Sequence, residues 1–293
     1  MIQEPKRHLA MLSVGLLYGG NYSILKVVTP EFLTPFSFIV TRVGIATLAF
    51  WLIGLFAPQK VDWKRDGLMI FLCAFFGMGV NMLLFFKGVS LTSAINASLI
   101  MTLTPIMVFV CAIFILKEKL TKWKSLGLLI GLGGALLIAI PESSQGYGGN
   151  WVGDIMVLLN ALTYGAYLVL VKPLLSKYEP VTIAKWGFLI GFFIVLPFGF
   201  QDFIQITWEN LPTKVYWSMF YSIIGVTVVV YIINIWAMKK VSPSTVGSYI
   251  YVQPVFATLI ALIFFGEAFL IKHVIAAALV FVGVAMVIRQ PSR

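Results

Sequence analysis

Polar side chains recur at helical spacing inside the apolar stretches of this sequence, and their types could bind a solute. In the stretch 9–28, Tyr18, Tyr22 and Lys26 are four residues apart and share one helix face, with Asn21 beside them. Four later stretches carry comparable stripes, namely Asn96, Ser98 and Thr102; Asn160, Tyr164 and Tyr167; Thr227, Tyr231 and Asn234; and Thr245, Tyr249 and Gln253.

These stripes predict a cavity for a partly apolar, partly polar solute. Tyrosine offers a flat apolar face with a hydrogen-bonding tip, and amide groups fix the orientation of a ligand. The alternative is that the same residues only join helices through interhelical hydrogen bonds. We favour the cavity because the stripes fall on corresponding stretches of the two halves of the chain.

Two cations, Lys26 and Arg42, lie in or near apolar stretches and toward the same expected end as Lys87. They predict a cationic outer vestibule that attracts a carboxylate-bearing solute. The alternative is that the side chains snorkel to the lipid headgroups, which we favour for Lys87 and Lys172. Snorkelling fits Arg42 less well, because it lies about a turn and a half inside its helix.

The acidic residues give little support for proton coupling or for catalysis. Glu118 and Glu267 end their apolar stretches, where an ion pair or a surface anchor is a simpler role than proton transfer. Asp154 begins a stretch and favours the positive end of a helix dipole. His8 and His273 form no cluster, and the sequence has no P-loop or common hydrolase motif. We expect no enzyme activity, no metal and no cofactor.

Pro105 and Pro254 lie inside apolar stretches at corresponding places of the two halves. Each removes a backbone donor and leaves an upstream carbonyl free, so each is predicted to kink its helix. We interpret the kink either as a hinge or as a static bend that shapes the bundle, and the sequence favours neither.

The composition requires a membrane around these residues. Of 293 residues, 60% are hydrophobic and 11% are charged, with a mean hydropathy of +0.98. A soluble domain carries roughly 25% charged residues, so the outer surface of this chain must face lipid. Stretches long enough to cross a bilayer lie at 9–28, 35–57, 67–88, 93–116, 124–140, 151–172, 181–199, 215–237, 243–265 and 271–289.

The distribution of basic residues predicts the orientation of these spans. The net charge of +10 does not indicate nucleic acid, because the Lys and Arg residues lie in short gaps between apolar runs. Fifteen of the 21 lie on the side of the N-terminus and three on the other. By the positive-inside rule, both termini are expected in the cytoplasm.

The two halves of the chain repeat one another. The matching pairs are Tyr18 with Tyr164 and Lys26 with Lys172 at an offset of 146, Gly77 with Gly225 at 148, and Pro105 with Pro254, Glu118 with Glu267 and Gly134 with Gly283 at 149. Each unit has five spans, and because five is odd the second unit enters the membrane from the other side. Such inverted repeats are typical of secondary transporters.

The chain resembles the EamA-type branch of the drug/metabolite transporter superfamily. The likeness rests on Pro105 with Glu118 and Pro254 with Glu267, each pair 13 residues apart and each followed by a short turn and a glycine-rich final helix. The segments 92–94 and 241–243 before these prolines fit the same pattern. The resemblance implies a carrier of ten helices, with a central cavity lined by the first, third, fourth, sixth, eighth and ninth. It also implies export of amino acids, other metabolites or drugs, by proton exchange or facilitated diffusion.

We therefore expect an all-α integral membrane protein of ten transmembrane helices, with repeats at 1–140 and 151–290 and a linker at 141–150. The expected function is a secondary transporter, an exporter of small metabolites such as amino acids, working by alternating access. The alternatives are a channel or facilitator, or a membrane-embedded enzyme. Expected partners are a small-molecule substrate and the lipid bilayer, without nucleic acid, and protons are a candidate coupling ion. We expect a monomer in a bacterial inner membrane.

Overall fold

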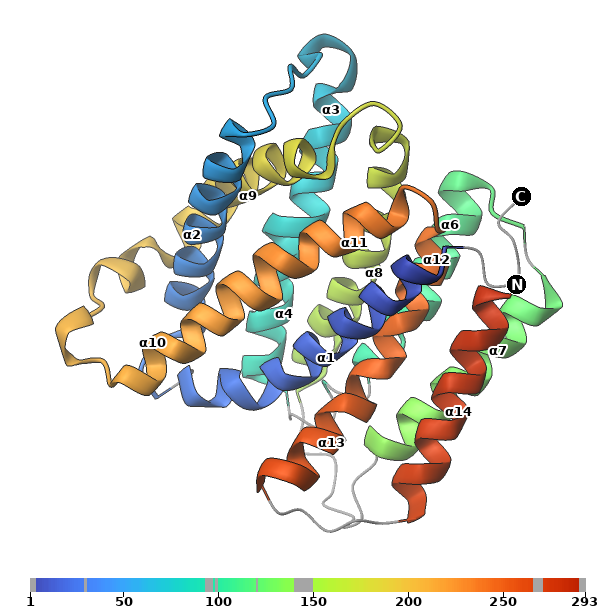
Figure 1. The fold of residues 1–293 in the computed structure, drawn as a ribbon. Coiled ribbons are helices and arrows are strands. Elements are labelled where there is room, and N and C mark those ends of the chain that lie inside the picture. The colour runs from blue at the N-terminus through green and yellow to red at the C-terminus, as the bar shows by residue number, and fades with distance from the viewer. Residues whose placement is uncertain are drawn as a thin grey trace.

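The computed structural model describes residues 4–28, 31–92, 97, 100–119, 121–139, 150–265 and 271–289, and these residues form helices joined by short connections, without a strand (Figure 1). The elements are α1 (Pro5–Val28), α2 (Pro35–Leu55), α3 (Trp63–Ala74), η1 (Phe75–Gly79), α4 (Val80–Leu91), α6 (Thr104–Leu116), α7 (Lys122–Ala139), α8 (Trp151–Leu174), α9 (Pro180–Ile204), η2 (Trp208–Asn210), α10 (Thr213–Phe220), η3 (Tyr221–Val229), α11 (Val230–Met238), α12 (Pro243–Ser248), η4 (Tyr249–Tyr251), α13 (Val252–Phe265) and α14 (Ile271–Ile288). The predicted all-α class is confirmed.

The ten predicted spans correspond to ten helical segments of the described chain. The third span consists of α3, η1 and α4, the eighth of α10, η3 and α11, and the ninth of α12, η4 and α13. Five of the segments are long and apolar enough by themselves to cross a membrane: 35–55, 63–91, 151–174, 180–204 and 213–238. Shorter apolar helices at 104–116 and 274–288 contribute to the fourth and tenth spans.

The packing of the segments follows the predicted inverted repeat. The second span of each half packs on the second span of the other, α2 on α9, and the fifth spans α7 and α14 pair in the same way. The sixth span, α8, packs on α4 and α6, while the first span, α1, packs on α11 and α13. Each first-of-repeat helix therefore lies between the third and fourth helices of the opposite repeat, as a twofold relation between inverted units requires.

Two irregular segments interrupt corresponding spans. η1 in the third span and η3 in the eighth are π-helical, and they contain the matched pair Gly77 and Gly225. π-helical turns are rare, and they often mark functional places in a helix. The sequence pattern did not predict these π-helical segments, because the polar stripes were assigned on the spacing of a regular α-helix, which has 3.6 residues per turn.

The two prolines lie where the regularity of their spans changes. Pro105 lies in the first turn of α6, directly after a break at residues 102–103, and Pro254 lies in the first turn of α13, after the 3₁₀ segment η4. A proline is tolerated in the first turn because that N–H has no intrahelical partner. Each proline therefore stands near the start of a regular α-helical segment, and the predicted kinks and hinges stay predictions.

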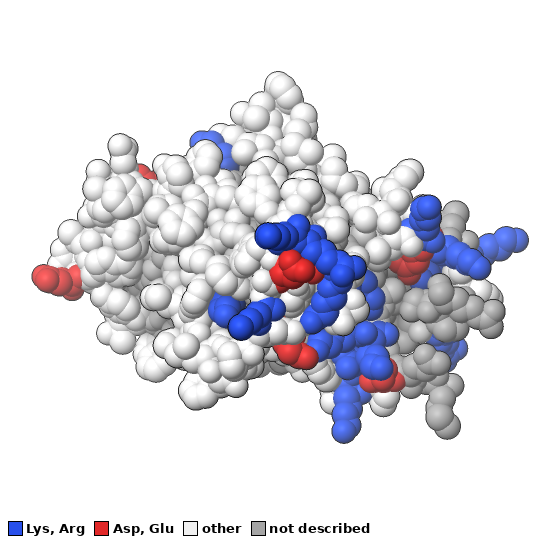
Figure 2. All heavy atoms as spheres, turned by 90° about the horizontal axis from the view of Figure 1, so that it is seen from above, with Lys and Arg blue, Asp and Glu red and all other residues white. Residues whose placement is uncertain are grey.

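Basic side chains gather at one end of the molecule, which Figure 2 shows from above. The start of α1, the end of α14 and the connections α2–α3, α8–α9 and α11–α12 lie at this end (Figure 1), which we call the basic end. Lys177 Nζ lies 2.6 Å from Asp66 Oδ1, and the Tyr178 hydroxyl donates to Asp66 Oδ2 at 2.8 Å. These contacts join α3 to the α8–α9 connection.

Glu118 and Lys172 also join segments at the basic end. Glu118 forms an ion pair with Lys124 and accepts a hydrogen bond from the Ser244 hydroxyl at 2.6 Å, which joins the α6–α7 connection to α12. This agrees with the ion-pair reading of Glu118, whereas Glu267 lies outside the described residues. Lys172 does not snorkel: its ammonium donates to the backbone carbonyls of Met238 and, at 2.9 Å, Val241. Those carbonyls at the end of α11 are unpaired in the helix itself, so a cation satisfies them.

Candidate functional site: a polar cavity between the two repeats

The described helices enclose a cavity of about 120 Å³ between the two repeats. Its described lining consists of Tyr18, Asn21, Arg42, Asn81, Met82, Phe85, Phe86, Met101, Thr104, Asn160, Tyr164, Tyr231, Ile250 and Gln253. These residues come from the first, third, fourth, sixth, eighth and ninth spans, which are the spans that the family resemblance implies, and from the second span through Arg42. The cavity is thus lined by both repeats.

Arg42 is the charged group of the described lining. Its side chain is buried in the bundle, with 7% exposure for the whole residue, and its Nε donates to the Thr227 hydroxyl at 2.6 Å. The hydroxyls of Tyr18 and Tyr231 are close enough to interact with it electrostatically. Arg42 therefore lies in the cavity wall. α2 presents this position to the bundle interior, against η3, and the cationic outer vestibule stays a prediction.

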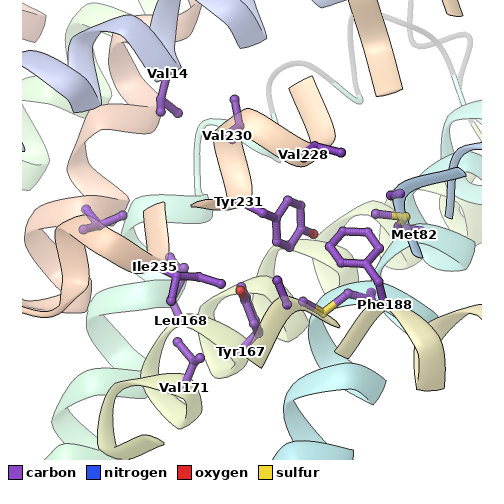
Figure 3. Packing of buried hydrophobic residues seen from close by; sticks show 14 of the residues in the cluster. Val14, Met82, Tyr167, Leu168, Val171, Phe188, Val228, Val230, Tyr231 and Ile235 are labelled. Atoms are coloured by element: carbon purple, nitrogen blue, oxygen red, sulfur yellow. The ribbon is translucent and has the colours of Figure 1, made fainter. Parts of the chain in front are cut away.

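Tyrosines surround the arginine and connect different helices. Tyr18 of α1 and Tyr164 of α8 share a hydrogen bond, and the Asn234 amide donates to the Tyr164 hydroxyl at 3.4 Å. The Tyr231 hydroxyl donates to the backbone carbonyl of Gly77 at 2.9 Å. Figure 3 shows Tyr231, Tyr167 and Phe188 gathered from α11, α8 and α9. The centroid of the Phe188 ring is 4.9 Å from that of Tyr231, in an edge-to-face arrangement that aromatic pairs prefer.

A reciprocal pair of amides joins α4 to α8 at the cavity wall. The Asn81 side-chain amide donates to the backbone carbonyl of Asn160 at 3.0 Å. In return, the Asn160 side-chain amide donates to the backbone carbonyl of Asn81 at 2.8 Å. Asn81 also donates to the Thr163 hydroxyl at 3.2 Å. Asn160 is among the residues predicted to line the cavity and Asn81 is not, although an amide inside the apolar run 67–88 is itself a signal for an interior polar site.

The two amides should contribute separately to stability. Each side chain donates to the backbone carbonyl of the other residue, and alanine keeps that carbonyl, so each substitution removes only the bond of its own side chain. Interhelical hydrogen bonds in membranes average about 0.6 kcal/mol and reach about 1.7 kcal/mol, so we expect Asn81→Ala and Asn160→Ala each to lower the free energy of unfolding by about 1 kcal/mol. Reversible unfolding of the two variants and the wild-type protein in detergent measures it. Wild-type stability in both variants would contradict the arrangement.

The remaining predicted site residues lie outside the cavity wall or outside the described structure. Tyr167 is buried next to Tyr164, and Thr102 is buried just before α6. Thr227 contacts the lining residue Arg42, and Asn234 contacts the lining residue Tyr164. Tyr249 contacts His8 at 2.8 Å, because the 3₁₀ segment η4 changes the helical phase between Thr245 and Gln253. The predicted residues that lie outside the described residues or side chains are Tyr22, Lys26, Asn96 and Ser98.

The apolar part of the lining was not predicted. Met82, Phe85, Phe86, Met101 and Ile250 look like any other apolar residue of a span, so no signal in a single sequence separates them from lipid-facing side chains. They make the cavity amphipathic, with one cation, several amides and hydroxyls, and aromatic faces. No group of three or more His, Cys, Asp or Glu side chains that could hold a metal occurs among the described residues.

A multi-span helical protein with inverted repeats and an enclosed amphipathic cavity between them belongs to the class of membrane transporters. The comparisons specify the family. The model of the EamA-like transporter family matches the chain twice, over residues 6–140 and 151–289, so the chain belongs to this family.

Relatives agree with the family assignment, and a solved structure shares the fold. A protein described as an uncharacterized transporter from Archaeoglobus fulgidus is 24% identical over 270 residues, covering 88% of this chain and 89% of its own. The uncharacterized transporter YyaM of Bacillus subtilis is 23% identical, covering 94% and 92%, and a WAT1-related protein of Arabidopsis thaliana is 23% identical, covering 99% and 87%. A crystal structure with 18% identity superposes with a TM-score of 0.80 over 96% of both chains, which shows a shared fold.

Proposed function

We propose that this transporter is a secondary carrier that exports a small carboxylate-bearing metabolite, such as an amino acid, by alternating access through the central cavity. The observation that carries the proposal is Arg42, a buried cation in a described lining that holds no acid. A desolvated guanidinium attracts an anion, and its planar fork matches a carboxylate. The inverted repeats support alternating access, because the two units can close over a shared site from opposite sides.

The contacts at the basic end close one side of the proposed transport path. By the positive-inside rule, this end is proposed to face the cytoplasm. There the Arg7 guanidinium of α1 donates to the Trp236 carbonyl of α11 and lies 4.3 Å from the centroid of the Trp236 ring. Together with the hydrogen bond between Ser244 and Glu118, this joins the two repeats at the basic end. Loading a solute from the cytoplasm would require these contacts to separate.

The cavity lining supports a small solute with an apolar part. Tyr18, Tyr164 and Tyr231 offer ring faces beside the cation, which suits a solute with an apolar part next to its carboxylate. The described lining offers no carboxylate to carry a proton, which supports exchange or facilitated diffusion over proton coupling.

Flux measurements on purified protein in liposomes test the proposed function. Labelled amino acids, nucleosides and cationic drugs are screened for uptake with and without a pH gradient, against protein-free liposomes. The proposal expects saturable uptake and counterflow of a carboxylate-bearing solute, with little dependence on the gradient. Flux that does not saturate and shows no counterflow would indicate a channel instead. A carrier that moves only nucleosides or cations would contradict the substrate class.

A further inference from the structure

The two π-helical segments are each held by a side chain from the opposite repeat. η1 belongs to the first repeat and is contacted by Tyr231 of the second, while η3 belongs to the second repeat and is contacted by Arg42 of the first. Both contacting side chains also line the cavity. We propose that Thr227 is a positioning residue through which an anion bound at Arg42 acts on η3, so that occupancy of the cavity controls the helical register of the eighth span.

The hydrogen bonds of Thr227 place it between the cavity and the π-helix. Its hydroxyl accepts from Arg42 Nε at 2.6 Å and donates to the carbonyl of Ser222 at 3.0 Å. Ser222 is five residues earlier, which is the spacing of π-helical backbone bonds. Thr227 is fully buried, so water does not compete for its hydroxyl. A single side chain thus connects the cation of the cavity to the turn that defines η3.

A matching contact holds η1. The Gly77 carbonyl lies within η1 and accepts from the Tyr231 hydroxyl at 2.9 Å. Residue 77 must also be glycine for this packing, because a Cβ there would lie 2.5 Å from Cδ2 of the Tyr167 ring. The π-helical turn of the first repeat is therefore held from both sides, by a hydrogen bond and by a ring.

A change of register at these segments would move cavity residues. Conversion of a π-helical turn to an α-helical turn shifts the following residues by one position, which is a rotation of about 100° and a rise of about 1.5 Å. The residues that follow are Asn81 after η1 and Tyr231 after η3, and both line the cavity. The segments are thus placed where a small local change alters the shape of the solute site and the contact between repeats.

A carboxylate at Arg42 would compete with Thr227. The bidentate pairing of a guanidinium with a carboxylate uses two parallel N–H donors, and the side-on form uses Nε together with one Nη. Nε is the atom that now donates to Thr227. The carboxylate brings a full opposite charge and two parallel bonds, where the neutral hydroxyl accepts only one, so the anion should displace the hydroxyl. η3 would then lose the contact that ties it to α2.

Backbone amide hydrogen exchange of the full chain in lipid nanodiscs tests the first step without any ligand. We expect Thr227→Val to raise the exchange rate about ten-fold in residues 221–230, and Thr227→Ser to restore the wild-type rate. The matched control is Thr47→Val, since the buried Thr47 hydroxyl donates only within its own helix, to the Val43 carbonyl at 2.7 Å. Unchanged exchange in 221–230 for Thr227→Val, or an equal effect of Thr47→Val, would overturn the proposal.

Benzoate and its neutral isostere benzamide test the second step. Benzoate should raise the exchange rate of residues 221–230 in the wild-type protein, while benzamide should not, because only the carboxylate pairs with the guanidinium. In Thr227→Val, where the contact is already absent, benzoate should add no further increase there. Benzoate that leaves 221–230 unchanged, or benzamide that acts equally, would refute the coupling.

These results can be separated from a failure of the carrier function, on which the register control rests. If no solute shows saturable flux in liposomes, the proposed function fails, while both exchange experiments still report on Arg42, Thr227 and η3. If the carrier function holds, Thr227→Val should slow counterflow at saturation and leave the half-saturating concentration within about two-fold, with rescue by Thr227→Ser. If the loss of counterflow in Thr227→Val came entirely from a higher half-saturating concentration, Thr227 would be a binding residue. That result would overturn the positioning role.

Discussion

Replacing Arg42 with alanine is expected to lower the saturable uptake of carboxylate-bearing solutes by about 10- to 100-fold. A hydrogen bond to a charged group contributes about 1.5–3 kcal/mol, and about 1.4 kcal/mol corresponds to a factor of ten. Arg42→Lys should lose less, because it keeps the positive charge and loses the planar fork. Initial rates of uptake over a range of solute concentrations, in liposomes that contain equal amounts of folded protein, measure the effect.

Lys185 provides the matched control for this prediction. It is also a cation within a span, but its ammonium lies 4.9 Å from the centroid of the Trp51 ring and 5.6 Å from that of Trp186, and it is absent from the described cavity lining. Lys185→Ala should therefore leave uptake within about two-fold of wild type, because an exposed cation–π contact contributes only about 0.5–1 kcal/mol. Equal uptake by Arg42→Ala and wild-type protein for every solute would contradict the assignment of Arg42 to the solute site.

The charge of Arg42 has no counterpart in the second repeat. The offsets of 146 at Lys26 and 148 at Gly77 place the equivalent position at residues 188–190, which are Phe188, Leu189 and Ile190. The fold is therefore duplicated, while the charge in the described cavity lining is not.

Composition and repeat offsets were sufficient to predict the spans. A ten-span count follows from the length of apolar stretches, because the bilayer allows little else, and the inverted relation follows from an odd number of spans per unit. The pairing of α2 with α9 and of α7 with α14 could not be read from the sequence, because it depends on which small residues of two distant helices face each other.

The stripes of polar residues predicted the cavity better than they predicted each residue in it. Tyr18 and Asn160 line it because α1 and α8 keep α-helical phase up to the cavity, whereas Gln253 lines it after η4 has changed the phase of its segment. Thr227 and Tyr231 were placed on one face by their spacing of four, but the π-helical turns of η3 separate them, so that Thr227 contacts Arg42 while Tyr231 reaches Gly77. Single-sequence periodicity has no means of detecting an inserted residue in a turn.

Replacing Gly283 with alanine is expected to lower the free energy of unfolding by about 2–3 kcal/mol, through overpacking of the α7–α14 pair. A Cβ at this position would lie 2.5 Å from the backbone nitrogen of Gly131 and 2.6 Å from the backbone carbonyl oxygen of Gly127. Both are backbone atoms of a helix, so the strain cannot be relieved by a side-chain rotation. Small residues at such contacts let helices approach closely in membranes, where packing replaces the hydrophobic effect between helices.

The same helix pair offers a glycine that separates this packing effect from the general consequence of adding a methyl group. Gly133 of α7 is exposed, and a Cβ there would meet nothing within 4 Å, so Gly133→Ala should keep or slightly raise stability through the higher helix propensity of alanine. Reversible unfolding of the two variants in the same detergent measures the difference.

Because Gly283 and Gly134 were identified as equivalent positions of the two repeats, Gly134→Ala should resemble Gly283→Ala: its Cβ would lie 2.7 Å from the backbone carbonyl oxygen of Ala276. If Gly283→Ala were as stable as Gly133→Ala, the close approach of α7 and α14 would be excluded, and with it the twofold contact between the fifth spans.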